Sequence, residues 1–231
     1  MLIAKGFLAA VAVATAAHAA PARIDAEYSI SNNGLVIGRV VERFEREGTR
    51  YRIESVTRSE GLLKLFLDDT VTLRSEGRVG PRGLEPQRFD QLRARDPARD
   101  IHATFDWDAG RMRSEYRGEA HTESLPPGTQ DRLSVLYQFM NMGTPADEVR
   151  LSMSNGRKVA QYAYRKVGEA RLRTPAGEFD TLHYERITES ARESRAELWL
   201  ARDRHLVPVR VLFDDPGGLR LEQSLLSLTV Q

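Results

Sequence analysis

Apolar and polar residues alternate along much of this chain, with the two-residue period of a strand that buries one face. In RYRIESV, Tyr51 and Ile53 lie on one face, and charged residues fill most of the other. The same period recurs in three further stretches, Leu35–Val41, Ile101–Asp108 and Val207–Phe213. Repeated short runs of this kind predict antiparallel strands that are half buried.

Turn-forming residues separate these runs. They include Asn33-Gly34, Glu47-Gly48, Asp108-Ala109-Gly110, Asn155-Gly156, Pro175-Ala176-Gly177 and Pro216-Gly217-Gly218. Asn-Gly is a strong hairpin signal because both residues tolerate positive φ. The spacing predicts a meander of about a dozen strands, which is many for a flat sheet. We therefore expect a mainly β fold, a strongly curved antiparallel sheet that forms a half-barrel or open barrel.

One stretch interrupts the alternation, PPGTQDRLSVLYQFMNMG, which runs from Pro126 to Gly143. Thr129 or Asp131 can cap a helix there, and Gly143 can end it. The apolar stripe of this helix contains Leu133, Leu136, Tyr137 and Met140. Val135 and Phe139 widen the stripe, and a helix that is apolar nearly all round is a buried one. We expect the curved sheet to pack on this single central helix.

A second apolar run, GLLKLFLDD, begins at Gly61 and ends at Asp69. It is too short for a helix that is stable alone. It therefore forms either the entry to a strand or a loop. Its apolar side chains are those of Leu62, Leu63, Leu65 and Phe66.

The N-terminus has the three parts of a secretory signal. Lys5 precedes a small, apolar run, and Ala17-His18-Ala19 places small residues where signal peptidase reads them. The apolar run is too short to span a bilayer, which needs roughly 20 residues. We expect a cleaved signal peptide at 1–19, with cleavage near Ala19, and one β-rich domain at 20–231. The mature protein is then periplasmic and has no transmembrane segment.

Charge and cysteine content limit the classes of partner that the protein can bind and the way it folds. Cleavage after residue 19 removes one lysine and no acid, so the 34 basic residues fall to 33 against 33 acidic ones. A neutral chain lacks the basic surplus that a nucleic-acid binder needs. The chain has no cysteine and therefore folds without disulfides.

The candidate chemistry is sparse. No H-E-x-x-H pair, glycine-rich phosphate loop or G-x-S-x-G motif occurs in the sequence. His183 and Glu185 share one face of the predicted strand EFDTLHYERI, so they could form a hydrogen-bonded pair. Such pairs are more often structural than catalytic, and no nucleophile stands beside this one. We therefore predict no catalytic residue, no metal ligand and no cofactor.

The C-terminal block carries a family resemblance. It contains Thr174-Pro175, Gly177 and Phe179, then Trp199 and Ala201, then Pro208-Val209-Arg210. With YSISNNGLVIGRV and DRLSVLYQF, this pattern resembles the exported bacterial proteins of domain-of-unknown-function family 3108, over nearly all of 25–229. The resemblance implies a compartment and a curved half-barrel like those of periplasmic lipoprotein carriers, in which helix or loop plugs an apolar concavity. It implies no reaction.

Three hypotheses about function follow. The first is a noncatalytic binding protein for a lipid or another apolar small molecule. Its ligand-binding residues would be Leu62, Leu63, Leu65, Phe66, Leu133, Leu136, Tyr137 and Met140. The alternative is an envelope interaction or assembly factor that contacts a protein partner through a sheet edge or an apolar patch. An enzyme of unknown type comes third.

Overall fold

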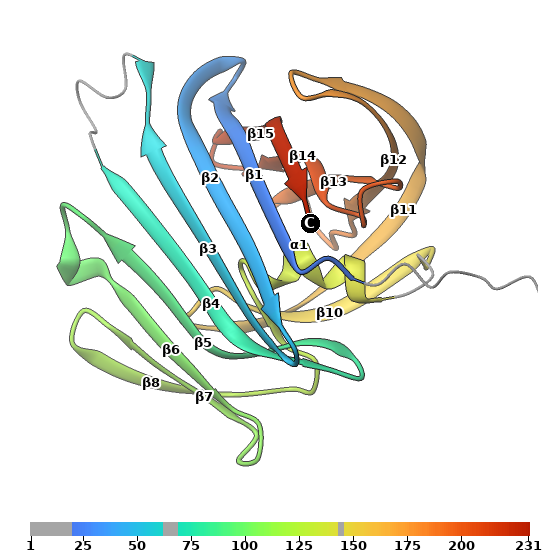
Figure 1. The fold of residues 1–231 in the computed structure, drawn as a ribbon. Coiled ribbons are helices and arrows are strands. Elements are labelled where there is room, and N and C mark those ends of the chain that lie inside the picture. The colour runs from blue at the N-terminus through green and yellow to red at the C-terminus, as the bar shows by residue number, and fades with distance from the viewer. Residues whose placement is uncertain (1–19, 62–68, 143–145) are drawn as a thin grey trace, which may run out of the picture.

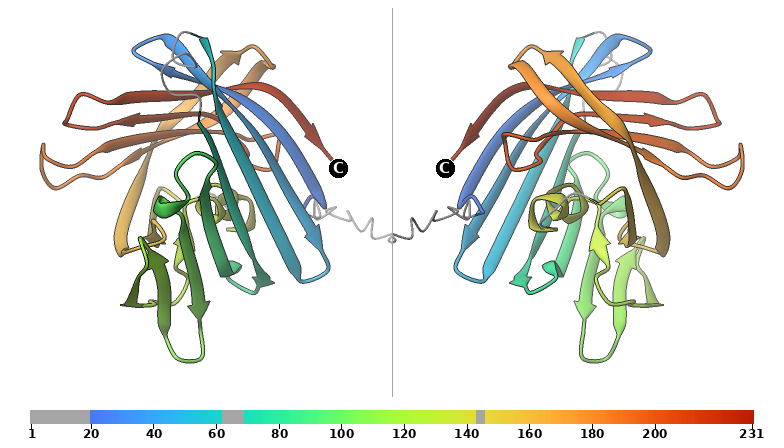
Figure 2. Two further views of the ribbon diagram at one scale, coloured as in Figure 1. Left: turned by 90° about the vertical axis from the view of Figure 1, so that its left-hand side faces the viewer. Right: turned by 90° about the vertical axis from the view of Figure 1, so that its right-hand side faces the viewer.

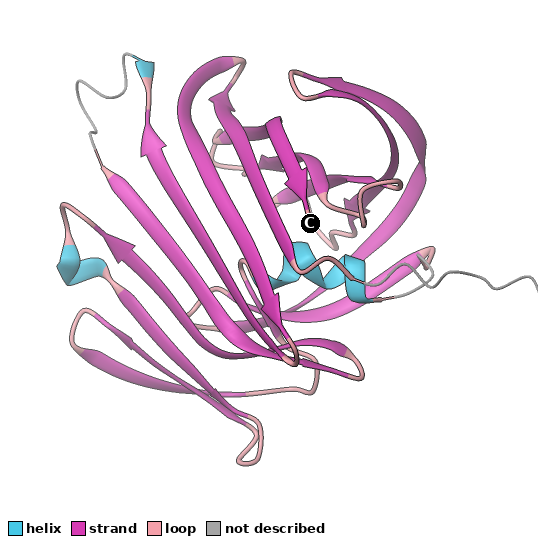
Figure 3. Ribbon diagram, in the orientation of Figure 1, coloured by secondary structure: helices cyan, strands magenta, loops and turns pink. Residues whose placement is uncertain are grey.

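A computed structural model describes residues 20–61, 69–142 and 146–231 of the chain. Strand is the dominant structure in Figure 3, and the strands form one sheet of fifteen. In chain order they are β1 (Arg23–Asn32), β2 (Leu35–Glu47), β3 (Arg50–Ser59), β4 (Thr70–Gly80), β5 (Gly83–Arg93), β6 (Ile101–Asp106), β7 (Arg111–Tyr116), β8 (Glu119–Ser124), β9 (Gln130–Asp131), β10 (Glu148–Ser154), β11 (Val159–Thr174), β12 (Gly177–Arg186), β13 (Arg195–Ala201), β14 (Pro208–Asp214) and β15 (Arg220–Val230). The predicted fold class is confirmed.

The sheet is a meander in which the first and the last strand of the chain are neighbours in the middle of the sheet. Its order is β8-β7-β6-β5-β4-β3-β2-β1-β15-β14-β13-β12-β11-β10-β9. The first strand pairs with the last, from Ile24 opposite Val230 to Asn32 opposite Leu221. Among the fifteen strands of the described sheet, β9 and β10 are the one pair that runs parallel. The sheet is strongly curved and does not close, and Figure 2 shows its two halves turned toward each other.

Hairpin chemistry explains the connections. At the β1–β2 turn, Asn33 and Gly34 both have positive φ, 49° and 82°. This is the pair that a two-residue turn needs to follow the twist of its strands. The alternation of β3 is also confirmed, since Tyr51 and Ile53 are buried while Arg50 and Arg52 are exposed.

The predicted helix is present and shorter than its apolar stripe. An α-helix, α1, covers Ser134–Gln138, and a 3₁₀ helix continues it over Phe139–Asn141. A third short helix, also 3₁₀, covers Pro97–Arg99. Figure 1 shows α1 inside the curve of the sheet. No helix in the described ranges is long and apolar enough to cross a membrane.

Two clusters of buried side chains meet at this helix. Leu133 and Tyr137 pack with Phe44 and Leu84 from the first half of the sheet. Phe139 packs with residues from β10 to β13. The helix therefore joins the inner faces of both halves, and burial of its side chains is the main source of its stability at this length.

Candidate functional site

The structure describes four of the eight residues predicted to bind a ligand. Leu133 and Tyr137 are each 2% exposed and belong to the core. Leu136 and Met140 are partly buried and pack against the same cluster. Leu62, Leu63, Leu65 and Phe66 lie outside the described residues. The role of this set as a ligand site stays a prediction.

The two ends of β3 lie far apart in the part of the chain that the structure describes. Tyr51 at the beginning of β3 packs in the cluster that contains Leu133 and Tyr137. At the other end, the Glu60 N–H donates to the Ile37 carbonyl beside the β1–β2 hairpin. Eight residues of strand between Tyr51 and Ser59 span about 27 Å. The sequence next to the apolar run is thus far from the helix.

Asp131 holds the backbone at the start of α1 from a buried position. Its Oδ1 accepts the backbone N–H groups of Leu133 and Ser134 at 2.8 and 2.9 Å, and its Oδ2 accepts the Ser75 hydroxyl. The N-cap of α1 is Leu133, which has no side-chain cap, so neither predicted cap occupies that position; Thr129 donates to the Pro126 carbonyl. Burial raises the pKa of the Asp131 carboxyl above its ordinary value, although these donors oppose the shift.

A second buried acid, Glu42 on β2, accepts a hydrogen bond from the helix. The Tyr137 hydroxyl donates to Glu42 Oε1 at 2.7 Å, and the Tyr137 ring stacks on Phe44 with centroids 5.0 Å apart. Glu42 and Phe44 are two residues apart on one strand, so they share its inner face. Burial raises the pKa of the Glu42 carboxyl, and the hydrogen bonds from Tyr137 and Ser55 act in the opposite direction. Because these contacts fill the space around α1, this part of the sheet is a packed core.

An open groove of about 800 Å³ lies elsewhere, between β15, the β11–β12 hairpin and the β13–β14 turn. One part of its lining is apolar and comes from Pro175, Ala176, Phe179, Leu226, Leu228 and Val230. Another part is the charged turn of Asp203, Arg204 and His205. The volume is within the usual range for small-molecule sites. The groove can therefore hold a ligand that is partly apolar and partly polar.

The turn that lines this groove is strained. His205 and Leu206 have φ of 54° and 57°, in the left-handed region that favours glycine. Two consecutive non-glycine residues there are uncommon, and each costs on the order of 1–3 kcal/mol. Strain of this kind concentrates at ligand sites and turns. The Arg204 guanidinium pairs with Asp203 at 2.7 Å, so a positive charge is held at the edge of the groove.

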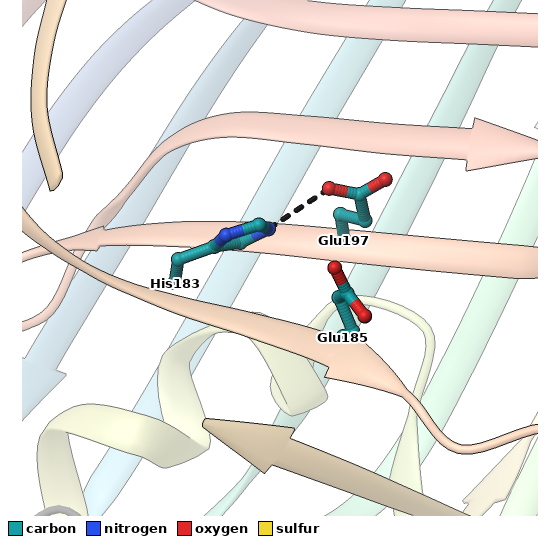
Figure 4. Close-up of side chains that lie close together, drawn as sticks. All are labelled: His183, Glu185 and Glu197. Atoms are coloured by element: carbon teal, nitrogen blue, oxygen red, sulfur yellow. Dashed lines mark hydrogen bonds and ion pairs between the residues drawn. The ribbon is translucent and has the colours of Figure 1, made fainter. Parts of the chain in front are cut away.

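A cluster of a histidine and two glutamates lies on β12 and β13 (Figure 4). The His183 Nε2 is 2.8 Å from Glu197 Oε2. The expected partner, Glu185, lies in the same cluster but is not the hydrogen-bonded one. Glu197 was missed because it is on the next strand, directly opposite Glu185. Strand pairing, which the sequence does not state, brings it there.

Apolar side chains are also exposed at the hairpin end of the sheet. Leu35 and Val36 are 64% and 47% exposed, and Leu219 is 44% exposed. The Asn33 N–H donates to the Arg220 carbonyl, which places the β1–β2 and β14–β15 turns side by side. We call Leu35, Val36 and Leu219 the apolar rim.

By architecture, the chain is a mainly β protein with one open, strongly curved antiparallel sheet around a short buried helix. A family model described as "Protein of unknown function (DUF3108)" matches residues 27–224. The chain belongs to this family, as the resemblance of its C-terminal block predicted. No curated protein matches the chain.

Solved structures give looser likenesses. A protein described as a lipoprotein from Parabacteroides distasonis is 11% identical, with TM-score 0.38, over 91% of this chain and 96% of its own. An exported protein from Bacteroides fragilis has 13% identity and TM-score 0.38 over the same shares. An outer membrane lipoprotein-sorting protein domain from Vibrio parahaemolyticus has 10% identity and TM-score 0.27, over 90% of this chain and 85% of its own. At these TM-scores the likenesses carry no argument about this chain.

Proposed function

We propose that this chain is an exported, noncatalytic binding protein for an amphiphilic ligand, such as a lipid with an acyl chain and an anionic headgroup. The observation that carries the proposal is the groove of about 800 Å³ with apolar side chains beside a charged turn. The signal-like N-terminus supports export to the periplasm. The packed core around α1 supports placing the ligand in the groove.

The chemistry of the groove fits such a ligand. Leu226 and Leu228 are partly exposed at the groove and offer apolar surface to a chain, and burying each CH₂ group contributes about 0.8 kcal/mol. Arg204 lies at the same groove and can donate to an anionic oxygen. Its ion pair with Asp203 is half exposed, so exchange for a ligand anion costs little.

Native mass spectrometry of the protein purified gently from a periplasm tests the proposal. We expect an added mass that matches a lipid, and saturable binding of a fluorescent fatty acid. Leu226→Arg should weaken this binding at least about 10-fold, because the longer side chain fills the groove and puts a charge against the ligand chain. Leu226 lines the groove without belonging to a buried core cluster, so the variant should fold.

Val167→Arg is the matched control. Val167 is 41% exposed on β11 and does not line the groove, so this variant adds the same charge elsewhere. Its binding should equal that of the unchanged protein. A bare polypeptide mass, together with no binding of the fatty acid, would remove the proposal. Equally weakened binding in both arginine variants would mean that the ligand does not bind in the groove. A third variant, Leu136→Gln on α1, tests the alternative location, and loss of binding in this variant alone would place the ligand at α1.

A different observation, the apolar rim, favours a second candidate, an envelope interaction or assembly factor. Leu35 is 64% exposed and belongs to none of the core clusters formed by the described residues. Surface of this kind marks contacts with other proteins when it is contiguous. A photo-reactive residue at position 35 should then crosslink to one defined protein in cells, and the same residue at position 167 should not. Absence of a specific product at position 35 would exclude this candidate.

A further inference from the structure

We propose that His183, Glu185 and Glu197 form a binding site for a divalent transition-metal ion, with Zn²⁺ as the physiological class. Each residue offers one ligand atom, and these atoms lie within 4.8 Å of one another. All three side chains are partly exposed, so an ion can reach them from solvent. The site shares β12 with the proposed ligand groove, but none of its three residues lines the groove, so it does not depend on the ligand proposed there.

The separation is close to what an ion requires. Ligand atoms bound at about 2.0–2.2 Å to one tetrahedral ion are about 3.4 Å apart. The pair His183 Nε2 and Glu197 Oε2 is already closer, at 2.8 Å. A movement of about 1.5 Å by the Glu185 carboxylate would complete three sides of the tetrahedron. A glutamate can make that movement by rotating its terminal torsions, which are broad.

Charge favours a cation at this position. Among the residues that the structure describes, Glu185 forms no ion pair or side-chain hydrogen bond, while Glu197 is bonded only to His183. Two carboxylates in one cluster repel each other unless a proton or a cation lies between them. The nearest register partner of Glu185 on β11 is Arg165, which makes no ion pair with it. A dication would balance both carboxylates at once.

The neighbouring side chains orient the imidazole. The His183 ring stacks on Trp199 with centroids 4.2 Å apart and 11° between the planes. The guanidinium of Arg210 lies 4.9 Å from the same indole and pairs with Glu222 at 2.9 Å. Trp199 is thus held between its register partners on β12 and β14. A fixed ring keeps Nε2 pointed at the carboxylates (Figure 4), which lowers the entropic cost of binding an ion.

The donor set selects the metal class. Imidazole nitrogen suits Zn²⁺, Cu²⁺ and Ni²⁺, whereas Mg²⁺ and Ca²⁺ prefer sites made of oxygen alone. Three protein ligands leave a coordination position for water or another molecule. We therefore expect affinity in the order Cu²⁺ above Zn²⁺, with Mg²⁺ and Ca²⁺ not competing at equal concentration.

Calorimetry with Zn²⁺ on untagged, EDTA-stripped protein tests the site. We expect one ion per chain. Glu185→Gln should weaken binding at least about 10-fold, which is the low end of the loss seen for groups near a metal. Since Glu185 has no ion-pair or side-chain hydrogen-bond partner within 20–61, 69–142 and 146–231, this neutral replacement should leave folding intact. His183→Ala should reduce binding at least as much.

His102→Ala is the matched control. The His102 Nδ1 is 2.7 Å from Asp90 Oδ1, so His102 is also paired with an acid. The Asp90 carboxylate is bonded to Arg88 as well, and His102 does not belong to the three-residue cluster. Its removal should leave Zn²⁺ affinity unchanged. The chain has two tryptophans, so Trp107→Phe leaves Trp199 as the only indole. Cu²⁺ should quench that indole at one equivalent, and Glu185→Gln should shift the quenching to at least about 10-fold higher Cu²⁺.

Two results would overturn the inference. One is the absence of saturable binding of a single Zn²⁺ ion. The other is an unchanged Zn²⁺ affinity in both Glu185→Gln and His183→Ala, which would leave His183 and Glu197 as a structural ion pair only.

Discussion

Tyr137→Phe removes one hydroxyl from the interface between α1 and β2. The hydroxyl donates to Glu42 at 2.7 Å, and the two residues are 2% and 4% exposed. Phenylalanine keeps the ring that stacks on Phe44, so the substitution leaves little cavity. The cost is therefore that of a buried hydrogen bond to a carboxylate, about 1.5–3 kcal/mol of unfolding free energy when Glu42 is ionised.

The sign of the pH dependence follows from Glu42. Its pKa is higher in the folded protein than in the unfolded chain, so the folded state holds its proton more tightly. Stability from this group is present in acid and is lost as pH rises from the ordinary glutamate pKa through the raised one. Tyr137 opposes the rise, so its removal should raise the pKa of Glu42 further. The loss from Tyr137→Phe should thus be larger at pH 8 than at pH 5.

Urea denaturation at both pH values measures this loss. We expect a cost toward about 1.5–3 kcal/mol as the pH rises and more of Glu42 is ionised, and toward about 0.5–1.5 kcal/mol as the pH falls and more of it is protonated, so the cost should be larger at pH 8 than at pH 5. Glu42→Gln is the control background, because its amide oxygen still accepts the hydroxyl but does not titrate. There, Tyr137→Phe should cost the same at both pH values. Equal costs with glutamate at position 42 would refute the reasoning.

Two further substitutions test how the helix is held. Leu133→Ala should cost about 2–5 kcal/mol in the same denaturation assay, because Leu133 is 2% exposed in the core; a loss below about 1 kcal/mol would mean that the site is not tightly packed. Gly83→Ala should cost at least about 1–3 kcal/mol, since Gly83 has φ of 99° and a Cβ there would lie 2.4 Å from Gln138 Oε1. Gly110→Ala, at φ of 62° with no atom within 4 Å of its Cβ, is its control and should lose less.

Local sequence was sufficient for much of the fold. Alternation predicted which residues of β3 are buried, and Asn33-Gly34 predicted a hairpin that the positive φ values confirm. These features depend on residues close together in the chain, so a short window contains their causes. The apolar stripe around Leu133 likewise predicted a buried helix, although neither expected cap, Thr129 or Asp131, occupies its N-cap position.

Sequence reasoning was weaker wherever distant residues meet. It placed a helix across the whole apolar stripe, but α1 ends at Gln138 and continues as 3₁₀. The Gln138 side chain bonds to the backbone of Leu84 and Arg82 on the β4–β5 hairpin at 2.8 Å each. Such ties from a side chain to a remote backbone have no signature in the sequence.

The candidate sites show the same division. Phe179 and Leu228 look like ordinary strand residues, and only the pairing of β15 within the curved sheet puts them in a groove with Arg204. Glu197 lies fourteen residues after His183, at no recognised metal spacing, and the β12–β13 register brings the two together.

By itself, the sequence determined the strands, their turns, the buried helix and the family, because periodicity and turn chemistry are local properties. Only the tertiary structure decided that β1 pairs with β15 and that the sheet stays open between β8 and β9. Long-range pairing depends on how the whole sheet twists and packs around α1, and many registers satisfy one alternating pattern equally well. The groove and the His183 cluster both arise from that pairing, so both became visible only in the folded chain.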